Sequence, residues 1–429
     1  MIERLSKYPL EGEWMFAACI ANKKKKRRMN EKLNHLGIDV GKRKCRAAVK
    51  DDKGNILDEF FFGNDAIGID NLLSRVKTNG THYTTATQAV LESTGNMWMR
   101  IHDTLEENGI DTVLANPYKT KIIAEAKIKS DKLDARILSD LLRTDLIYES
   151  YVPKQEDRDK RSLVRNRITL SRTKTKLVNK VHSILDKYDY KTELTDIFGV
   201  AGIRWLKSLL PKVSSIDGII LTTSIESIQT INHQIDVVSK EISKYACRND
   251  KDVKILMSIT GIDTFAAMLI SAEIVDVRRF STPWKLVSYA GLAPATRESA
   301  GKTITGRITK QGSPWLRWIL VQCALVAVKY DIRLGMFYNR IKNRKGHGKA
   351  IVATAKELLV IIWYMLTRKR TLQTHEQAKI PTEITEIRNI LTQLNKDTLN
   401  VAAANVIHSG VFLRLEKADI RIKNIDIVG

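Results

Sequence analysis

Cysteine and acidic residues are both scarce in this chain of 429 residues. The four cysteines are Cys19, Cys45, Cys247 and Cys323, and no two of them form a C-x-x-C pair. This spacing argues against a zinc ribbon and against a disulfide framework, and it fits the reducing cytoplasm. Asp and Glu number 48 against 71 Lys and Arg, which gives a net charge of +23. Such a surplus repels itself unless it meets a polyanion, so a nucleic acid is the first partner to consider and an anionic membrane surface the second.

The sequence predicts no transmembrane helix. The most apolar stretch, Ile351–Leu366, carries a Lys–Glu pair in its middle. Near the N-terminus an apolar segment, Met15–Ala21, precedes six consecutive cations, Lys23–Arg28. A secretory signal has these two parts in the opposite order. Residues 1–34 are therefore interpreted as a basic leader: a disordered arm lying on phosphates, a solvated tail, or an extension added by a start codon that lies too far upstream.

Residues 35–153 show the pattern of an α/β domain. Leu36–Val40 alternates apolar residues with small or acidic ones, including Asp39, which is the period of two expected of a strand. Strands are also predicted over Cys45–Val49 and Ile56–Phe62, so the first three strands form an antiparallel meander. A helix, a strand, a helix, a strand and two helices follow. This order predicts a mixed sheet covered by helices.

Residues 154–250 are predicted to be helical, and the first part is strongly basic. No Gly or Pro interrupts the chain from Glu156 to Lys187, and nine residues between Arg158 and Lys180 are basic against one acidic. Several of these cations recur at spacings of four or seven, so they share one helical face. A stripe of one charge destabilises a helix unless something neutralises it, which favours contact with a nucleic-acid backbone over a solvated surface. The residues of this face are Arg161, Arg165, Arg172, Lys176 and Lys180.

The second part of this segment carries a regular apolar seam. Its residues step by three and four without a break, which predicts a helix that pairs in a coiled coil. The partner is either within the chain or in another subunit, and covering a domain core is the alternative. The seam consists of Ile228, Ile231, Ile235, Val238, Ile242 and Tyr245.

Residues 251–370 are interpreted as a mainly helical domain, followed by a tail, residues 371–429, in which no motif is recognised. The segment Leu256–Ile262 resembles a helix-hairpin-helix, in which a turn with glycine, here Gly261, lets backbone amides approach a DNA phosphate. A buried helical hairpin is the alternative. A loop is predicted over Gly301–Gly312, and its glycines and cations suit a phosphate. Those cations are Lys302, Arg307 and Lys310.

Four acidic residues are candidates for metal ligands. Asp39 lies mid-strand among apolar residues, where an unpaired carboxylate is expensive, and Glu92 directly follows the predicted strand Ala86–Leu91. Asp131 and Asp134 lie three apart at a predicted helix start and so face the same way, although the helix dipole alone also favours acids there. If the four meet at one sheet edge, their oxygens suit Mg²⁺ or Mn²⁺. Two such ions about 3.5–4 Å apart can promote phosphodiester cleavage.

Ser313 has two interpretations. It stands before Pro314 and a helical sequence, so it is an ideal N-cap with proline at the first helical position. The residues alone favour that role. A helix N-terminus also favours the negative charge of a phosphate and of a developing alkoxide. No general base is recognised nearby in the sequence, so a nucleophilic Ser313 would need activation by metal-bound carboxylates of another domain or subunit.

Taken together, these segments resemble the DEDD transposases of bacterial and archaeal insertion sequences. The four acids of that family fall on Asp39, Glu92, Asp131 and Asp134, and its serine on Ser313. The resemblance extends over roughly residues 36–368. The matching segments are Leu36–Val40, Leu91–Gly95, Lys129–Ala135, Ser258–Pro294, Gln311–Ser313 and Gly348–Leu366.

The resemblance implies a fold, a chemistry and partners. The N-terminal domain would be ribonuclease H-like, of the Holliday-junction resolvase branch, with the four acids holding Mg²⁺ or Mn²⁺. Ser313 would be a nucleophile that forms a covalent phosphoserine link to DNA, as in serine recombinases. A structured RNA made from the element's own ends would pair with donor and target DNA. Recombination would pass through a Holliday junction in a homo-oligomer, a dimer or a tetramer.

Three other functions fit part of the sequence. Gly37–Gly41 with the turn Asp52–Gly54 also resembles the first phosphate loop of sugar kinases and actin-like ATPases. The second phosphate loop and the adenosine site of that class are not recognised, and a shared fold does not decide function. A Holliday-junction endonuclease would explain the four acids but not residues 251–368. A non-catalytic nucleic-acid-binding protein would explain the charge but not the acids.

Overall fold

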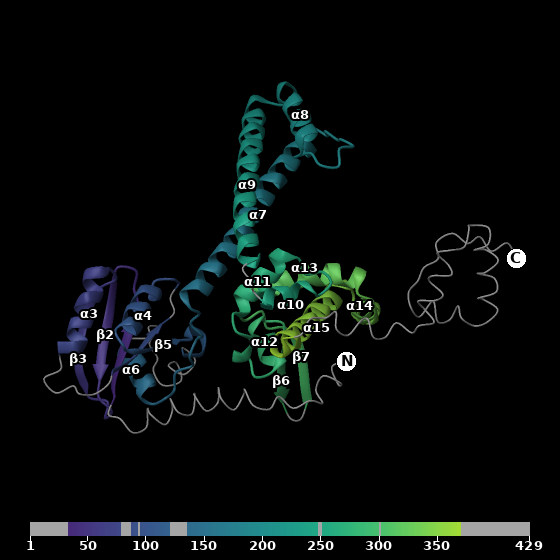
Figure 1. The fold of residues 1–429 in the computed structure, drawn as a ribbon. Helices are drawn as coiled ribbons and strands as arrows, with labels where there is room; N and C mark the ends of the chain where they lie inside the picture. Colours follow the sequence, from purple (N-terminus) through teal and green to yellow (C-terminus); the bar gives the residue numbers. More distant parts are fainter. Residues whose placement is uncertain are drawn as a thin grey trace, which may run out of the picture. The chain divides into compact units, whose positions relative to one another are not determined.

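The structure is a computed structural model that describes residues 33–78, 87–92, 95–120, 135–247, 251–299 and 302–369 (Figure 1). The chain divides into two compact units, residues 1–153 and residues 154–429. The expected basic leader, apart from its last two residues, and the expected tail lie outside the described residues. Asp131 and Asp134 lie outside them as well.

The first unit is built on a five-stranded mixed sheet with the strand order β3-β2-β1-β4-β5. The first three strands pair antiparallel, and β4 and β5 run parallel to β1. This confirms the predicted meander and the predicted mixed sheet. The strands are β1 (Asn34–Asp39), β2 (Lys44–Lys50), β3 (Ile56–Gly63), β4 (Thr87–Glu92) and β5 (Asp111–Ala115).

Helices cover both faces of this sheet. On one face α3 (Ala66–Thr78) and α4 (Trp98–Glu107) enclose the larger core, to which alternate strand residues contribute. The other face packs against α6 (Ala135–Arg143), chiefly through β1. Gly37 permits this contact, because a Cβ there would lie 2.1 Å from the carbonyl oxygen of Ala135. The first residue of α6 therefore lies directly against β1.

The second unit is mostly helical, as the sequence predicts. Its longest helices, α7 (Gln155–Lys187) and α9 (Ser215–Cys247), pack along one another as a hairpin, and α8 (Val200–Ser208) lies at the far end (Figure 1). A short 3-10 turn, Leu210–Lys212, leads into α9. The apolar seam of α9 is used within the chain: Ile228 and Ile242 are buried, and Ile235 is half-buried.

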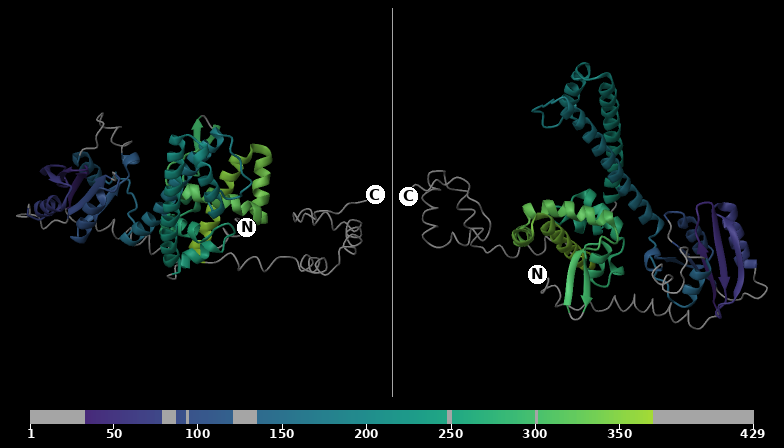
Figure 2. Two further views of the ribbon diagram at one scale, coloured as in Figure 1. Left: turned by 90° about the horizontal axis from the view of Figure 1, so that it is seen from above. Right: turned by 180° about the vertical axis from the view of Figure 1, so that it is seen from behind.

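The rest of this unit is a bundle of helices with one small sheet. The bundle comprises α10 (Lys251–Met257), α11 (Thr264–Ile274), a 3-10 turn (Val277–Arg279), α12 (Pro283–Tyr289), α13 (Pro314–Tyr330), α14 (Ile332–Lys345) and α15 (His347–Arg368). The sheet is a hairpin of β6 (Pro294–Ser299) and β7 (Lys302–Ile308) (Figure 2). The loop predicted over residues 301–312 was therefore wrong in part. The β-branched run Thr303–Thr305 suits a strand, and β6 supplies its partner.

α15 is long and apolar enough to cross a membrane by length and composition alone. In this unit it is a core helix that packs against α10, α12, α13 and α14. Most of its apolar side chains are buried in those contacts. Burial inside the protein therefore accounts for its hydrophobicity.

Candidate functional site

Asp39 and Glu92 lie side by side at the C-terminal ends of neighbouring parallel strands. Ile38 of β1 is in register with Leu91 of β4, so the next residues, the two acids, are at the same level of the sheet. Because side chains alternate along a strand, both acids belong to the face that α6 covers. Burial, and then the charge of Asp39, raise the pKa of Glu92 above its ordinary value. A pair of carboxylates that repel one another is suited to a cation.

The other two expected acids, Asp131 and Asp134, lie outside the described residues. Among the residues that are described, no group of three or more His, Cys, Asp or Glu side chains could hold a metal ion. Ala135, the residue after Asp134, lies against Gly37, which precedes Asp39 by two positions. The described part of the chain thus brings together two of the four expected ligands and the start of the helix that follows the other two.

Ser313 caps α13, as the sequence predicts. Its Oγ accepts a hydrogen bond from the backbone N–H of Leu316 at 3.1 Å, and Pro314 is the first helical residue. The turn before it depends on Gly312, whose φ is +109°. A Cβ on Gly312 would lie 2.0 Å from the carbonyl oxygen of Tyr289. Ser313 is only 8% exposed, so its hydroxyl is held in one position by the turn and the helix.

The hydroxyl of Ser313 also contacts a buried carboxylate that sequence reasoning missed. Glu273 of α11 is 0% exposed, and the Ser313 hydroxyl donates a hydrogen bond of 2.8 Å to its Oε2. Arg165 of α7 donates to both carboxylate oxygens, at 2.7 and 3.0 Å. The sequence shows no base close to Ser313 because Glu273 lies 40 residues earlier, and folding brings the two side chains together.

A sequence signal for Glu273 did exist. It is the one charged residue in the run Phe265–Val275, where every neighbour is apolar or small. An ionised side chain in such a helix is costly unless a partner compensates it. The pattern alone could have marked Glu273 as a paired carboxylate, although it could not name Arg165 or Ser313 as its partners.

Three of the five cations on the predicted basic face bind within the second unit. Arg161 donates to the backbone carbonyls of Ala272 and Glu273 at the end of α11, at 3.0 and 3.4 Å. Arg165 pairs with the carboxylate of Glu273. The Arg172 guanidinium carbon lies 4.5 Å from the centre of the Trp315 ring. Internal contacts therefore account for much of this stripe of charge.

The remaining expected nucleic-acid contacts differ in their surroundings. Lys176 and Lys180 are exposed on α7, and Arg307 and Lys310 are exposed before α13. Lys302 belongs to β7, and its side chain lies outside the described residues. Gly261 forms the turn between α10 and α11, where a Cβ would lie 2.8 Å from the carbonyl oxygen of Cys323 on α13. Close packing against α13 explains this glycine without a bound phosphate.

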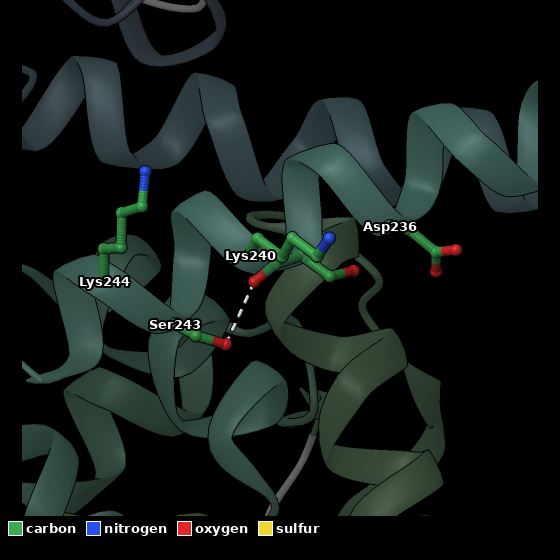
Figure 3. Close-up of a pocket in the computed structure, with 5 residues that line it drawn as sticks. Asp236, Lys240, Ser243 and Lys244 are labelled. Atoms are coloured by element: carbon green, nitrogen blue, oxygen red, sulfur yellow. Dashed lines mark hydrogen bonds between the residues drawn. The ribbon is translucent and has the colours of Figure 1, made fainter.

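A shallow hollow on α9 offers a second surface (Figure 3). Its lining comes from successive turns of that one helix and includes Asp236, Lys240, Ser243 and Lys244. The hydroxyl of Ser243 donates to the backbone carbonyl of Ser239 at 3.0 Å. None of the site residues expected from the sequence lines this hollow.

Comparison with known proteins gives matches on both units. A family profile described as "Transposase" matches residues 36–189, and one described as "Transposase IS116/IS110/IS902 family" matches residues 253–339. The transposase for insertion sequence element IS1111A of Coxiella burnetii is 23% identical over 365 residues, which cover 81% of this chain and 93% of that protein. The transposase for insertion sequence element IS1328 of Yersinia enterocolitica is 24% identical over 341 residues, which cover 78% and 96%.

Proposed function

Because the chain belongs to the IS110/IS116/IS902 family of insertion-sequence transposases, we propose that it cuts and rejoins DNA with a serine nucleophile and a divalent-metal site. Ser313 is the nucleophile, and Asp39, Glu92, Asp131 and Asp134 hold Mg²⁺ or Mn²⁺. The observation that carries the proposal is the pairing of Asp39 with Glu92 at one sheet edge. A purely structural role for either acid would not require the other as its neighbour.

We also propose that the first unit has a ribonuclease H-like fold of the Holliday-junction resolvase branch. Its five-stranded mixed sheet is covered by helices on both faces, and its paired acids stand at the ends of β1 and β4. Ligands gather at the carboxyl ends of parallel strands in open sheets, because several chain segments meet there.

The donors in this unit fit a hard divalent cation. Carboxylate oxygens are the ligands that Mg²⁺ and Mn²⁺ prefer. Burial, and then the charge of Asp39, raise the pKa of Glu92, and a bound cation would offset both effects. In the sequence Asp134 directly precedes Ala135, the residue that contacts β1. When bound, the metal supplies stabilisation of charge on the attacking and leaving oxygens of a phosphodiester.

The position of Ser313 supports its role as nucleophile. The N-terminus of α13 carries partial positive charge, which stabilises both a DNA phosphate and a serine alkoxide. The exposed Arg307 and Lys310 precede it and would hold the DNA backbone. Attack by Oγ on phosphorus gives the covalent phosphoserine link that the family resemblance implies.

The partners follow from charge and from the family. A net charge of +23, with Lys176 and Lys180 exposed on α7, supports binding to phosphate backbones of the element ends and the target. We also infer a guide RNA transcribed from the element's ends and a homo-oligomer, a dimer or a tetramer, as the resemblance to DEDD transposases implies.

A comparison of two helix caps tests whether Ser313 is a nucleophile or only a cap. Ser313-Pro314-Trp315 and Thr282-Pro283-Trp284 both cap a helix whose first residue is proline. Ser313→Asn keeps a side-chain acceptor for the cap, whereas Thr282→Ala removes a cap of the same kind elsewhere in the unit. The assay follows the covalent protein–DNA adduct and recombination of a plasmid that carries the gene with its flanking DNA, with RNA transcribed from those flanks supplied.

We expect Ser313→Asn to fold and to lose both adduct and recombination, while Thr282→Ala keeps them. Asp39→Asn should abolish recombination, because it removes a metal ligand. Recombination by Ser313→Asn would show that Ser313 is only a cap. Cleavage of DNA junctions by Ser313→Asn, with loss in Asp39→Asn, would instead favour a Holliday-junction endonuclease.

A further inference from the structure

Glu273 is a buried carboxylate to which the family resemblance gives no role. We propose that Glu273 accepts the proton of the Ser313 hydroxyl when Ser313 attacks DNA, and that Arg165 holds the carboxylate in place for that step. This proposal rests on the proposed function of Ser313 as nucleophile. It places proton transfer inside the second unit rather than at the metal-binding carboxylates.

The hydrogen bonds around Ser313 fix where its proton points. Its oxygen already accepts the backbone N–H of Leu316, so one lone pair is engaged. Its hydrogen is directed at Oε2 of Glu273, 2.8 Å away. Both distances lie in the range of a formed hydrogen bond, which is the geometry required of a nucleophile and its base.

Glu273 is held from three sides. Arg165 of α7 donates a hydrogen bond to each of its carboxylate oxygens. The backbone carbonyl of Glu273 accepts hydrogen bonds from the Tyr289 hydroxyl at 3.2 Å and from Arg161 at 3.4 Å. The groups that face Glu273 are therefore Arg161 and Arg165 from α7, Tyr289 from α12 and Ser313 from α13. A base fixed in this way does not need to reorganise when the reaction begins.

Arg165 adds a second property to this arrangement. Its side chain is 36% exposed, whereas Glu273 is fully buried. Part of the Arg165 side chain therefore reaches solvent beside the Ser313–Glu273 pair. An incoming phosphodiester would meet the charge of Arg165 as it approached Oγ, and Arg is well suited to bind a phosphate and a carboxylate at once because it has five N–H donors.

The proton and electron balance of the step is complete. Oγ of Ser313 forms a bond to phosphorus, and its proton passes to Oε2 of Glu273. The bond from phosphorus to the leaving nucleoside oxygen breaks, and that oxygen keeps the electron pair and takes a proton from solvent. In rejoining, a nucleoside hydroxyl attacks phosphorus and gives its proton to solvent, Oγ leaves with the bonding electrons, and Glu273 returns the proton of the first step to Oγ.

Glu273→Gln is the variant that tests this role. Glutamine keeps the size of the side chain and an acceptor oxygen but is a far weaker base. We expect the single-turnover rate of adduct formation to fall by about 10²- to 10⁴-fold, which is the usual contribution of a general base. Binding of the same DNA, measured by filter retention, should change little. The matched control is Asp331→Asn, because Asp331 is likewise a buried acid that pairs with an arginine, in this case at the N-cap of α14.

The pH dependence separates a base from a structural ion pair. With an internal acceptor, the wild-type rate should be nearly constant from about pH 7 to 9. Without it, the proton must leave to hydroxide, so the Glu273→Gln rate should rise about tenfold per pH unit. A pair that only stabilises the fold would lower the rate equally at every pH.

The outcomes are distinct. A Glu273→Gln rate within threefold of wild type, or one with the wild-type pH profile, overturns the role of Glu273 while leaving Ser313 as nucleophile. An adduct in Ser313→Ala overturns the proposed function itself. If Glu273→Gln does not fold, Glu273→Asp keeps the charge for Arg165 but withdraws the carboxylate by one methylene. Its rate should still fall at least tenfold, and an unchanged rate contradicts the proposal.

Discussion

The ion pair between Arg165 and Glu273 allows us to predict how much stability each of two arginines on the basic face of α7 contributes. Arg165→Ala leaves a fully buried carboxylate without its countercharge. Removing one partner of a buried ion pair costs about 3–5 kcal/mol. Water can reach the 36% exposed position of Arg165, so the lower end, about 3 kcal/mol, is expected. Arg172→Ala removes an exposed cation that lies over Trp315, worth about 0.5–1 kcal/mol.

Urea unfolding of the full chain, followed by circular dichroism, measures both variants. For a slope near 3 kcal/mol per molar urea, the midpoint of the helical transition should fall by about 1 M in Arg165→Ala and by about 0.2–0.3 M in Arg172→Ala. Adding Glu273→Gln to Arg165→Ala removes the uncompensated charge and should restore about half of the loss. Equal midpoints for the two arginine variants, or a double variant no more stable than Arg165→Ala, would refute the reasoning.

Four further measurements test other parts of the molecule. Mn²⁺ affinity, measured by titration calorimetry, should weaken as pH falls, because protons compete with the metal for the Glu92 carboxylate. Since the pKa of Glu92 is raised, the weakening should begin at a pH above the ordinary titration range of a glutamate, and Glu92→Gln should lose this dependence. Gly37→Ala should destabilise the first unit by at least about 1–3 kcal/mol in thermal melts, since its methyl group would overlap the start of α6. A hydrogen bond from Lys187, with others, lowers the pKa of Asp217 to about 2, so its stabilisation is present above the unfolded pKa and is lost as pH falls toward 2; acid titration of Asp217→Asn should be correspondingly flatter. Lys176→Gln should reduce the slope of log affinity against log salt by about 0.9 if that lysine contacts one DNA phosphate, and an unchanged slope contradicts the contact.

The sheet could be predicted because its signals are local. Alternation in β1 to β3 and the short turns between them specify an antiparallel meander within thirty residues or so of chain. Asp39 could be recognised as a candidate site residue, because burying an unpaired acid between Ile38 and Val40 in a strand costs free energy. That Glu92 would lie beside it required only that β1 and β4 be parallel neighbours.

Contacts between distant segments could not be predicted in the same way. A helical face identifies Arg161 and Arg165 as neighbours of one another, but it does not show whether they meet phosphate or protein. In the structure both arginines donate hydrogen bonds to residues at the end of α11, more than one hundred residues later. Ser313 and Glu273 are likewise 40 residues apart and meet only because α11 and α13 pack together. β7 was missed because a short strand that contains one glycine and follows another, Gly306 and Gly301, resembles a loop until its partner strand is known.

The length of the α7–α9 hairpin is restricted by the contacts of α7. Near Arg165 this helix is fixed to α11, and farther along Val181 and Leu185 are buried against α9. One inserted residue between these two regions would rotate everything beyond it by about 100° and carry Val181 and Leu185 into water. An addition close to a whole number of turns, such as seven residues for two turns or eleven for three, preserves both contacts, and α9 must then grow by the same amount. The reach of the hairpin can therefore change only in matched steps of nearly whole turns, about 10 Å for two turns, so length variants of such a protein should differ by paired insertions in the two helices.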